Sequence, residues 1–232
     1  MTNEIKQRVV DANKRLKSEG LIISTWGNVS EYDKKSNLVA IKASGVPYDT
    51  MTTSDIVVTD LEGHIIDGRL RPSTDLDTHL MLYKHFKGIR GIVHTHSMYA
   101  TIWGQAEMDI PILGTTHADY FRGDIPCTRQ MTKAEIETEY EANTGRVIVE
   151  RFKDLDPFQM RAVLVNKHAP FVWGSDAMDA VNNAIVLEYI AKMAWCNMVM
   201  EDGNLRKIDS DMVKKHYDRK YGEDAYYGQE KK

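Results

Sequence analysis

The sequence predicts an α/β fold built on a mixed sheet, and two observations support that class. Amphipathic helical segments alternate with short β-rich runs along the whole chain, with no repeat, low-complexity tract or Pro/Gly-rich linker. Several successive β-rich runs are separated by only a few residues, which is too short for a parallel crossover and therefore requires antiparallel pairing. The 232 residues are expected to form a single domain over 1–232, long enough to bury a large core.

The elements of the first half follow from hydrophobic spacing and turn residues. Ile5, Val9, Ala12 and Leu16 recur at helical spacing, and Gly20 can end that helix. In chain order the sequence predicts a helix over 2–20, a strand running into a turn over 21–30, a β-rich run over 37–45, two short strands over 54–68, a helix over 73–86, a strand over 88–97 and a helix over 97–106.

The second half is more helical. Thr132 and Glu135 have the spacing of a capping box, so a helix is expected to begin there. The sequence then predicts a strand-like segment over 161–174, the longest helix over 175–200, a last helix over 211–222 and a tail over 223–232.

Composition and charge disfavour two classes of partner. The chain is 42% hydrophobic and 28% charged with a formal net charge of −4, and no basic run precedes Lys231 and Lys232, so no nucleic-acid partner is expected. No apolar run suggests a membrane span or a signal peptide, so no membrane partner is expected. Cys127 and Cys196 are far apart without ligand spacing, which predicts free thiols and a cytoplasmic location.

Two histidines flank one threonine in "GIVHTHS", at the end of an apolar run. Residues i and i+2 of a strand project from the same face, about 7 Å apart along the chain, so the imidazoles of His94 and His96 can converge on one ion. Imidazole nitrogen favours Zn²⁺ and neighbouring late transition metals. The alternative is a pair of ordinary surface or half-buried histidines.

A catalytic zinc site usually needs three protein ligands, and two other stretches offer further candidates. His168 ends the strand-like run in "LVNKHAP", and Asp75 lies at a turn in "RPSTDLDTH". The alternatives are that Asp75 or Asp77 caps the following helix and that His168 bonds a loop carbonyl. The chain lacks the H-E-x-x-H pattern of zinc proteases.

Three polar turns have the chemistry of anion binding, because small residues expose backbone N–H groups and hydroxyls add donors. They are "TWGNVS" with Gly27 and Asn28, "KASGV" with Lys42, Ser44 and Gly45, and "RPSTD" with Ser73 and Thr74. None matches a nucleotide-binding glycine motif, and each such stretch alone is more often just a turn. A small phosphorylated substrate would unite these turns with the adjoining metal ligands.

Seven stretches together resemble one enzyme family. They are "STWGNVS", "IKASGV", "RPSTDLDTH", "GIVHTHS", "GTTHADYFRGDIPCTR", "LVNKHAPFVWG" and "KHYDRKYGEDAYYGQ". In order and spacing they resemble the L-ribulose-5-phosphate 4-epimerase family of the class II aldolase/epimerase superfamily, from about residue 3 to Gln229. The resemblance implies a three-layer α/β/α fold around a mostly antiparallel sheet. It also implies one Zn²⁺ per subunit and a homotetramer with active sites at subunit interfaces.

The resemblance also assigns roles by position. The implied zinc ligands are Asp75, His94, His96 and His168; the implied phosphate contacts are Gly27, Asn28, Lys42, Ser44, Gly45, Ser73 and Thr74; the implied acid/base pair is Asp119 and Tyr227, supported by Thr116, His216 and Arg219. The C-terminal tail, about 210–232, would thereby contribute to the active site. Two departures from the common pattern are Ala43 in place of Pro and Thr74 in place of Ser.

The implied reaction is zinc-dependent epimerisation at C4, which interconverts L-ribulose 5-phosphate and D-xylulose 5-phosphate by retro-aldol cleavage of C3–C4 and re-addition. Arabinose-type pentose catabolism is the expected context, with ascorbate and xylulose pathways as alternatives for a related phosphorylated ketopentose. A zinc-dependent sugar-phosphate aldolase of the same superfamily is the main alternative, and a non-catalytic metal- or sugar-phosphate-binding protein is another. Asp rather than Glu at position 75, and the tail "AYYGQ", favour the epimerase.

Overall fold

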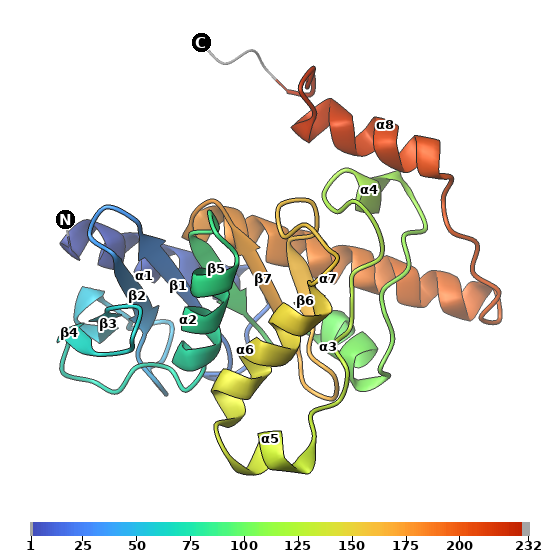
Figure 1. The fold of residues 1–232 in the computed structure, drawn as a ribbon. Coiled ribbons are helices and arrows are strands. Elements are labelled where there is room, and N and C mark those ends of the chain that lie inside the picture. Colours follow the sequence, from blue (N-terminus) through green and yellow to red (C-terminus); the bar gives the residue numbers. More distant parts are fainter. Residues whose placement is uncertain (1, 229–232) are drawn as a thin grey trace.

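A seven-stranded sheet runs through the centre of the computed structural model, which describes residues 2–228 (Figure 1). Its strand order is β4-β3-β2-β1-β5-β7-β6. The strands are β1 (Asn28–Asp33), β2 (Leu38–Lys42), β3 (Ile56–Thr59), β4 (Ile65–Asp67), β5 (Gly91–His94), β6 (Ala162–Leu164) and β7 (Pro170–Gly174). Every pairing between these strands is antiparallel, and parallel contacts in the described chain are limited to isolated bridges. The mostly antiparallel sheet that the resemblance implies is therefore confirmed, whereas the parallel strand pairs expected of a mixed sheet do not occur between these seven strands.

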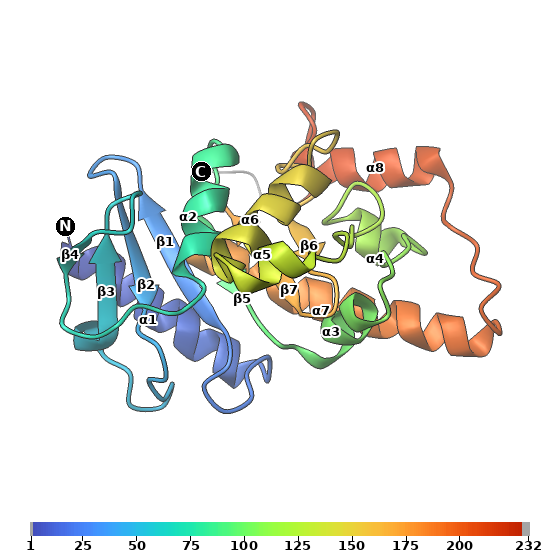
Figure 2. The same ribbon diagram turned by 60° about the horizontal axis from the view of Figure 1, so that its bottom comes forward.

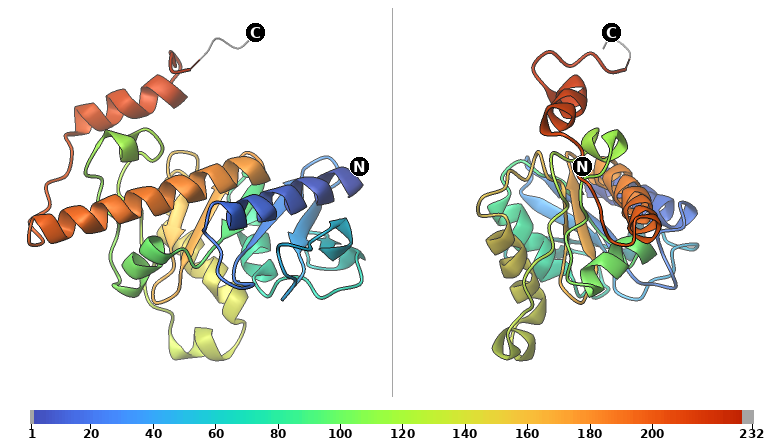
Figure 3. Two further views of the ribbon diagram at one scale, coloured as in Figure 1. Left: turned by 180° about the vertical axis from the view of Figure 1, so that it is seen from behind. Right: turned by 90° about the vertical axis from the view of Figure 1, so that its right-hand side faces the viewer.

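Helices cover both faces of the sheet. They are α1 (Thr2–Ser18), the 3₁₀ turn η1 (Thr53–Asp55), α2 (Leu76–His85), α3 (Met98–Gln105), α4 (Thr115–Ala118), α5 (Lys133–Glu137), α6 (Tyr140–Arg151), α7 (Ala177–Met200) and α8 (Ser210–Tyr221). One face carries α1, α3 and α7, and the other carries α2 and α6, which gives the predicted three layers (Figure 3). Helix α8 packs on α4 and stands away from the sheet (Figure 2).

The core lies on both faces of the sheet, because successive residues of a strand point to opposite faces. Trp173 of β7 is almost completely buried and its ring contacts Phe86 and Phe152, at the ends of α2 and α6. Buried residues of α7 such as Val181 and Leu187 belong to the same apolar cluster. A smaller apolar cluster lies under α1, where Val9 and Val10 meet Tyr48 and Met51. The apolar positions that predicted α1 from their helical spacing are thus buried, as an amphipathic surface helix requires.

Two predicted strands differ from the structure. The expected strand over 21–30 begins only at Asn28, because the backbone turns before it: Ser24 has φ 56° and Gly27 has φ 91°, both incompatible with a strand. The strand-like run over 161–174 is divided into β6 and β7 by a turn in which Lys167 has φ 58°. A run of apolar residues alone does not reveal such an interruption.

The predicted C-terminal half is otherwise close to the structure. The capping box at Thr132 is present, with the Thr132 side chain accepting from the Glu135 N–H, although this helix ends at Glu137 and α6 begins at Tyr140. Helices α7 and α8 lie where they were predicted. The last four residues of the predicted tail, 229–232, lie outside the described residues. No helix in the described range combines the length and apolar character that a membrane span needs, and its two cysteines form no disulfide.

Candidate active site

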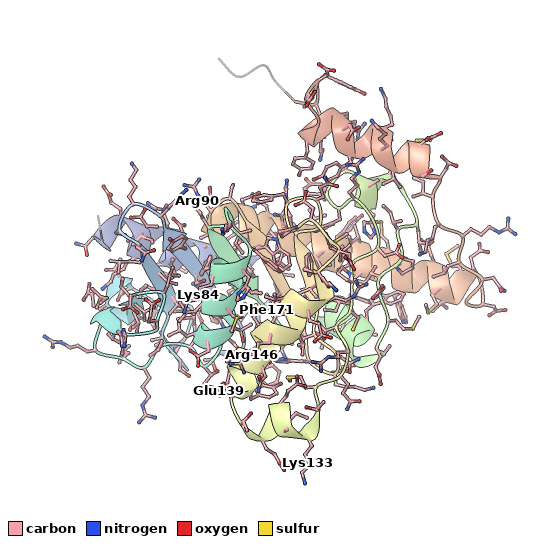
Figure 4. All side chains as sticks on the ribbon, viewed as in Figure 1. Lys84, Arg90, Lys133, Glu139, Arg146 and Phe171 are labelled. Atoms are coloured by element: carbon pink, nitrogen blue, oxygen red, sulfur yellow. The ribbon has the colours of Figure 1, made fainter. Side chains whose placement is uncertain are left out.

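His94 is fixed by the three central strands of the sheet. It ends β5, lies opposite Asn28 of β1 on one side, and lies opposite Phe171 of β7 on the other. The Phe171 ring, in the middle of the molecule in Figure 4, stacks on the His94 imidazole with centroids 4.3 Å apart. His94 Nδ1 lies 3.0 Å from the Pro170 carbonyl oxygen. Because that oxygen can only accept, Nδ1 carries the proton and Nε2 keeps its lone pair.

Three imidazoles meet in front of this strand end. His96 lies beyond the end of β5, yet its Nε2 is 3.2 Å from the Nε2 of His94, and the His168 ring centroid is 4.9 Å from that of His94 and 5.1 Å from that of His96. One possible ligand atom from each histidine lies within 4.8 Å of the others. The predicted convergence of the histidine pair is therefore present in the structure.

The donor set suits a late transition metal. Two nitrogens bound to Zn²⁺ at the usual distance of about 2.0–2.1 Å and at a tetrahedral angle lie about 3.3 Å apart, which is close to the observed 3.2 Å between His94 and His96. His168 Nδ1 is buried and has no hydrogen-bond partner in the described chain, so the alternative of a bond to a loop carbonyl is not realised through that nitrogen. Burial and then the neighbouring imidazoles lower the pKa of His168 to about 4, which leaves it neutral near pH 7, the state that binds metal.

Asp75 lies beside the histidines without joining their close group. It occupies the N-cap position of α2, but its side chain makes no capping bond; instead Oδ2 accepts from Asn28 Nδ2 at 2.6 Å. Burial disfavours its charge, but His94, His79 and the Asn28 amide outweigh burial, so the pKa of Asp75 is below its ordinary value. The capping alternative is thus not observed, and metal ligation by Asp75 stays a prediction.

The anion-type turns and the histidines line one cavity of about 360 Å³. All the predicted metal and phosphate residues contribute to it, namely Gly27, Asn28, Lys42, Ser44, Gly45, Ser73, Thr74, Asp75, His94, His96 and His168. Two of the turns are joined by backbone hydrogen bonds, because the Ser44 N–H donates to Arg71 and the Ser73 N–H donates to Lys42. These bonds hold the turn at residues 42–45 next to the turn at residues 73–74, and the two turns together form one side of the cavity, here called the phosphate-binding wall.

Two residues of these turns, Lys42 and Gly27, have surroundings that require a cationic side chain and a glycine, respectively. Lys42 is 2% exposed, its Nζ donates to the Ala43 carbonyl at 3.2 Å, and burial lowers its pKa to about 8. A buried ammonium of this kind gains from a nearby anion. A Cβ on Gly27 would lie 2.7 Å from the His94 carbonyl oxygen, so only glycine lets the first turn approach the metal-type cluster.

The cavity also includes residues that the sequence reasoning missed: Thr25, Trp26, Tyr140 and Glu141. The Trp26 ring centroid is 5.9 Å from that of His96, and its place beside Gly27 in "TWGNVS" was the available signal. Tyr140 and Glu141 are the first two residues of α6. The start of this helix is held by the Thr78 hydroxyl of α2, which donates to the Glu141 carbonyl at 2.6 Å. No sequence pattern indicates that contact between two helices.

The predicted acid/base residues lie in a second group. Arg219 holds Asp119 through Nε to Oδ1 at 2.9 Å and Nη2 to Oδ2 at 2.6 Å, and His216 Nδ1 is 3.0 Å from Oδ1. The Tyr227 ring lies 5.1 Å from the Arg219 guanidinium and is 60% exposed. Burial opposes the charge of Asp119, but Arg219 and His216 outweigh it, so its pKa is lowered.

The two groups are separated within one chain. None of Thr116, Asp119, His216, Arg219 and Tyr227 is among the described residues that line the histidine cavity. That cavity reaches the first turn of α6, next to α5 at the bottom of Figure 1, whereas α4 and α8, which carry Thr116, His216 and Arg219, lie at the top. In a single chain the predicted site residues therefore form two separate groups, the histidine cavity and the Asp119 group.

The chain is similar to proteins of one known family. A family model described as "Class II Aldolase and Adducin N-terminal domain" matches residues 7–195. L-ribulose-5-phosphate 4-epimerase UlaF of Salmonella paratyphi A (strain ATCC 9150 / SARB42) is 51% identical over 226 residues, covering 97% of this chain and 99% of the relative, and UlaF of Salmonella typhi is equally similar.

Solved structures have the same architecture. An L-fuculose 1-phosphate aldolase matches with a TM-score of 0.78 and 25% identity, over 93% of this chain and 95% of that one. YgbL of Klebsiella pneumoniae, described as a putative aldolase/epimerase/decarboxylase, matches with a TM-score of 0.71 and 23% identity, over 93% and 98% of the two chains, and shows the fold alone.

Proposed function

The chain belongs to the class II aldolase and adducin family, and we propose that it is an L-ribulose-5-phosphate 4-epimerase. The observation that carries this proposal is the cavity in which three imidazoles meet three anion-type turns. A metal-binding group and a phosphate-binding wall in about 360 Å³ suit a small phosphorylated sugar. The 51% identity to UlaF over nearly the whole of both chains supports the same reaction.

We assign the metal as Zn²⁺, one per subunit, held by His94, His96 and His168, with Asp75 as the proposed fourth ligand. When bound there, the ion would supply Lewis-acid polarisation of substrate oxygens. The chain itself contributes the three imidazoles and the Asn28 amide that orients Asp75.

The phosphate-binding wall selects and retains the substrate. The backbone N–H groups of Ser44 and Ser73 are engaged with Arg71 and Lys42, so the phosphate would use the Ser44 and Thr74 hydroxyls, the Gly45 N–H and the Lys42 ammonium. These donors would also hold glycolaldehyde phosphate after C3–C4 cleavage, which is what an epimerase needs and an aldolase does not. Retention lets the aldehyde turn and be attacked on its other face.

Cleavage rather than deprotonation follows from the substrate's chemistry. The C4–H is not acidic because the carbonyl is at C2, whereas loss of the C4 hydroxyl proton lets C4 become an aldehyde as the C3–C4 bond breaks. A base must take that proton, and an acid must return it to the C4 oxygen after re-addition. We assign these roles to Asp119, which is ionised beside Arg219, and to the exposed Tyr227 hydroxyl.

The separation of the histidine cavity from the Asp119 group within one chain supports an oligomer. We propose that the Asp119–Tyr227 group of one copy completes the histidine cavity of another, within the homotetramer that the family resemblance implies. Four apolar side chains on the last half of α7 support association between copies, because Tyr189, Trp195, Val199 and Met200 are 40–79% exposed.

The test is to incubate the zinc-loaded protein with L-ribulose 5-phosphate and to follow the products by NMR. The proposal expects D-xylulose 5-phosphate with little free dihydroxyacetone or glycolaldehyde phosphate. Accumulation of those two fragments would identify a sugar-phosphate aldolase, the alternative favoured by the likeness to L-fuculose 1-phosphate aldolase. No conversion with zinc verified in the protein would reject this substrate.

A further inference from the structure

The helix that follows His96 begins without a cap of its own. Ser97 is at the N-cap position of α3, but its side chain makes no capping bond in the described chain; instead its Oγ accepts from the Thr95 hydroxyl at 3.2 Å. The first N–H groups of a helix have no partner within that helix. The N-terminus of α3, two residues after His96, therefore needs an acceptor from elsewhere.

Glu188 of α7 is that acceptor. Its Oε1 accepts from the Tyr99 N–H at 2.8 Å, and its Oε2 accepts from the Ala100 N–H at 3.0 Å. One carboxylate thus satisfies two consecutive backbone donors and brings a negative charge to the positive end of the helix dipole. Glu188 is 89 positions away from Tyr99, so the contact fixes α3 against the longest helix of the fold.

Other contacts between α3 and α7 show that the whole helix is held in one place. The Trp103 indole N–H donates to the Ala191 carbonyl at 3.1 Å. The Tyr99 ring lies 5.4 Å from the Lys192 ammonium and 5.8 Å from the Trp195 ring. Glu188 differs from these contacts because it alone among them bonds the backbone at the end nearest to His96.

The three histidines differ in what holds them. His94 is fixed by the sheet, through Pro170 and Phe171, whereas His96 lies on the short segment between the end of β5 and the start of α3. We propose that Glu188 is a positioning residue for the metal centre: by anchoring the start of α3 it holds the His96 imidazole at its distance from His94. The carboxylate also offsets the positive helix end beside a bound cation. This inference rests on the metal site of the proposed function.

The test measures metal affinity rather than activity. Metal-free protein and its variants are titrated with Co²⁺ against a competing chelator, and the visible d–d absorption of the ion reports its ligand geometry. We expect Glu188→Ala to bind Co²⁺ about 10- to 100-fold more weakly and with an altered band shape, as for other residues that orient metal ligands. Glu188→Gln keeps one of the two acceptor oxygens, so its Co²⁺ affinity is expected to lie between those of the unaltered protein and Glu188→Ala. Asn182→Ala, an exposed change on the same helix, is the matched control and is expected to behave like the unaltered protein.

The outcomes separate this inference from the proposed function. If the unaltered protein binds Co²⁺ tightly and folded Glu188→Ala has the same affinity and spectrum, even with a lower urea midpoint, Glu188 has a structural role only and the inference is overturned. If the unaltered protein itself binds no Co²⁺, both the metal site and the inference are overturned. The inference is supported if Co²⁺ affinity falls in Glu188→Gln and falls further in Glu188→Ala, while Asn182→Ala keeps the affinity of the unaltered protein.

Discussion

At the scale of single residues, the histidine group combines one rigid member with two that depend on loops. His94 is 2% exposed, bonded to a backbone carbonyl and stacked on Phe171. His96 and His168 follow or precede strands, and His168 has a buried nitrogen without a partner in the described chain. Removing a loop member should therefore damage the group without unfolding the sheet.

His96→Asn tests that expectation. The amide cannot replace the imidazole Nε2 that lies 3.2 Å from His94, so we expect the variant to lose bound zinc and activity while its circular dichroism spectrum is unchanged. Metal content by mass spectrometry is the measurement, and an active, zinc-replete variant would remove His96 from the ligand set.

Residue chemistry made much of the site predictable, but not all of it. Asp75 and the three histidines, and the small polar residues of three turns, have side chains whose chemistry indicates a ligand, and all of them line one cavity. Tyr140 and Glu141 were missed because they reach the cavity through the packing of α6 on α2, which leaves no periodic or motif signal. The Asp119 group lies in another part of the fold, and spacing along the chain does not encode that separation.

At the scale of elements, the contact between α2 and α6 decides where Tyr140 and Glu141 lie. The helices approach closely at Gly145, where an added Cβ would be 2.6 Å from Met81 Cβ and 2.8 Å from its Cγ. Thr78 and the ion pair between Arg146 and Glu139, both labelled in Figure 4, hold the first turns of α6. The start of α6 is thus fixed by the Thr78 hydrogen bond and the ion pair, and the close approach at Gly145 holds the middle of the helix against α2.

Gly145→Ala is expected to destabilise the protein. Alanine normally favours a helix interior by about 1 kcal/mol over glycine, but overpacking costs about 1–3 kcal/mol, and the Met81 atoms involved are next to the backbone and cannot move away cheaply. We therefore expect a net loss of about 1 kcal/mol, and at most about 2 kcal/mol, in the free energy of unfolding, measured in urea. Met81→Ala removes only the Cγ contact and keeps Cβ, so in that background Gly145→Ala should cost less but still destabilise. A stabilised single variant would contradict the close approach.

Element boundaries were less predictable than element types. Apolar runs indicated most strands of the sheet, but one run covered both β6 and β7, and the strand predicted over 21–30 overlaps β1 only at 28–30 because residues up to Gly27 turn. The reason is tertiary: Gly27 turns so that its backbone can lie against the His94 carbonyl. Local propensity favoured a strand, and the approach to the site overrode it.

At the scale of the whole molecule, the proposed sharing of active sites between copies predicts complementation between inactive variants. His96→Asn removes a proposed metal ligand, and Tyr227→Phe removes the proposed acid while leaving the histidine group unchanged. When both chains are co-expressed in equal amounts, about one site in four of a cyclic oligomer combines an intact cavity with an intact Tyr227 from its neighbour. We expect up to about a quarter of normal turnover, against a loss of about 100-fold in Tyr227→Phe alone. Mixed oligomers with no recovered activity would mean that both residues serve the same chain's site.

Stability of the metal-free protein should fall with acid. Burial lowers the pKa of His79 to about 3 and the pKa values of His117 and His168 to about 4, all below the ordinary value of 6.5. As the pH falls below about 6.5, the unfolded chain takes up these protons before the folded chain does, so the stabilisation present at pH 7 is progressively lost towards pH 4. Each histidine contributes up to about 1.4 kcal/mol per pH unit in that window. Urea unfolding at pH 7, 6 and 5 measures this, and equal free energies of unfolding at all three values would contradict it.

The arm formed by α8 has an evolutionary consequence. It follows the last residue of α7 through a nine-residue connection over 201–209 and packs mainly on the short α4, while the histidine cavity is built into the sheet far from it. Changes in the arm can therefore accumulate without disturbing the cavity proposed to bind metal and phosphate. On the proposed function, selection can replace the groups assigned to proton transfer and keep the proposed metal and phosphate ligands, so descendants of one scaffold can diverge between releasing the two fragments of a cleaved sugar phosphate and rejoining them.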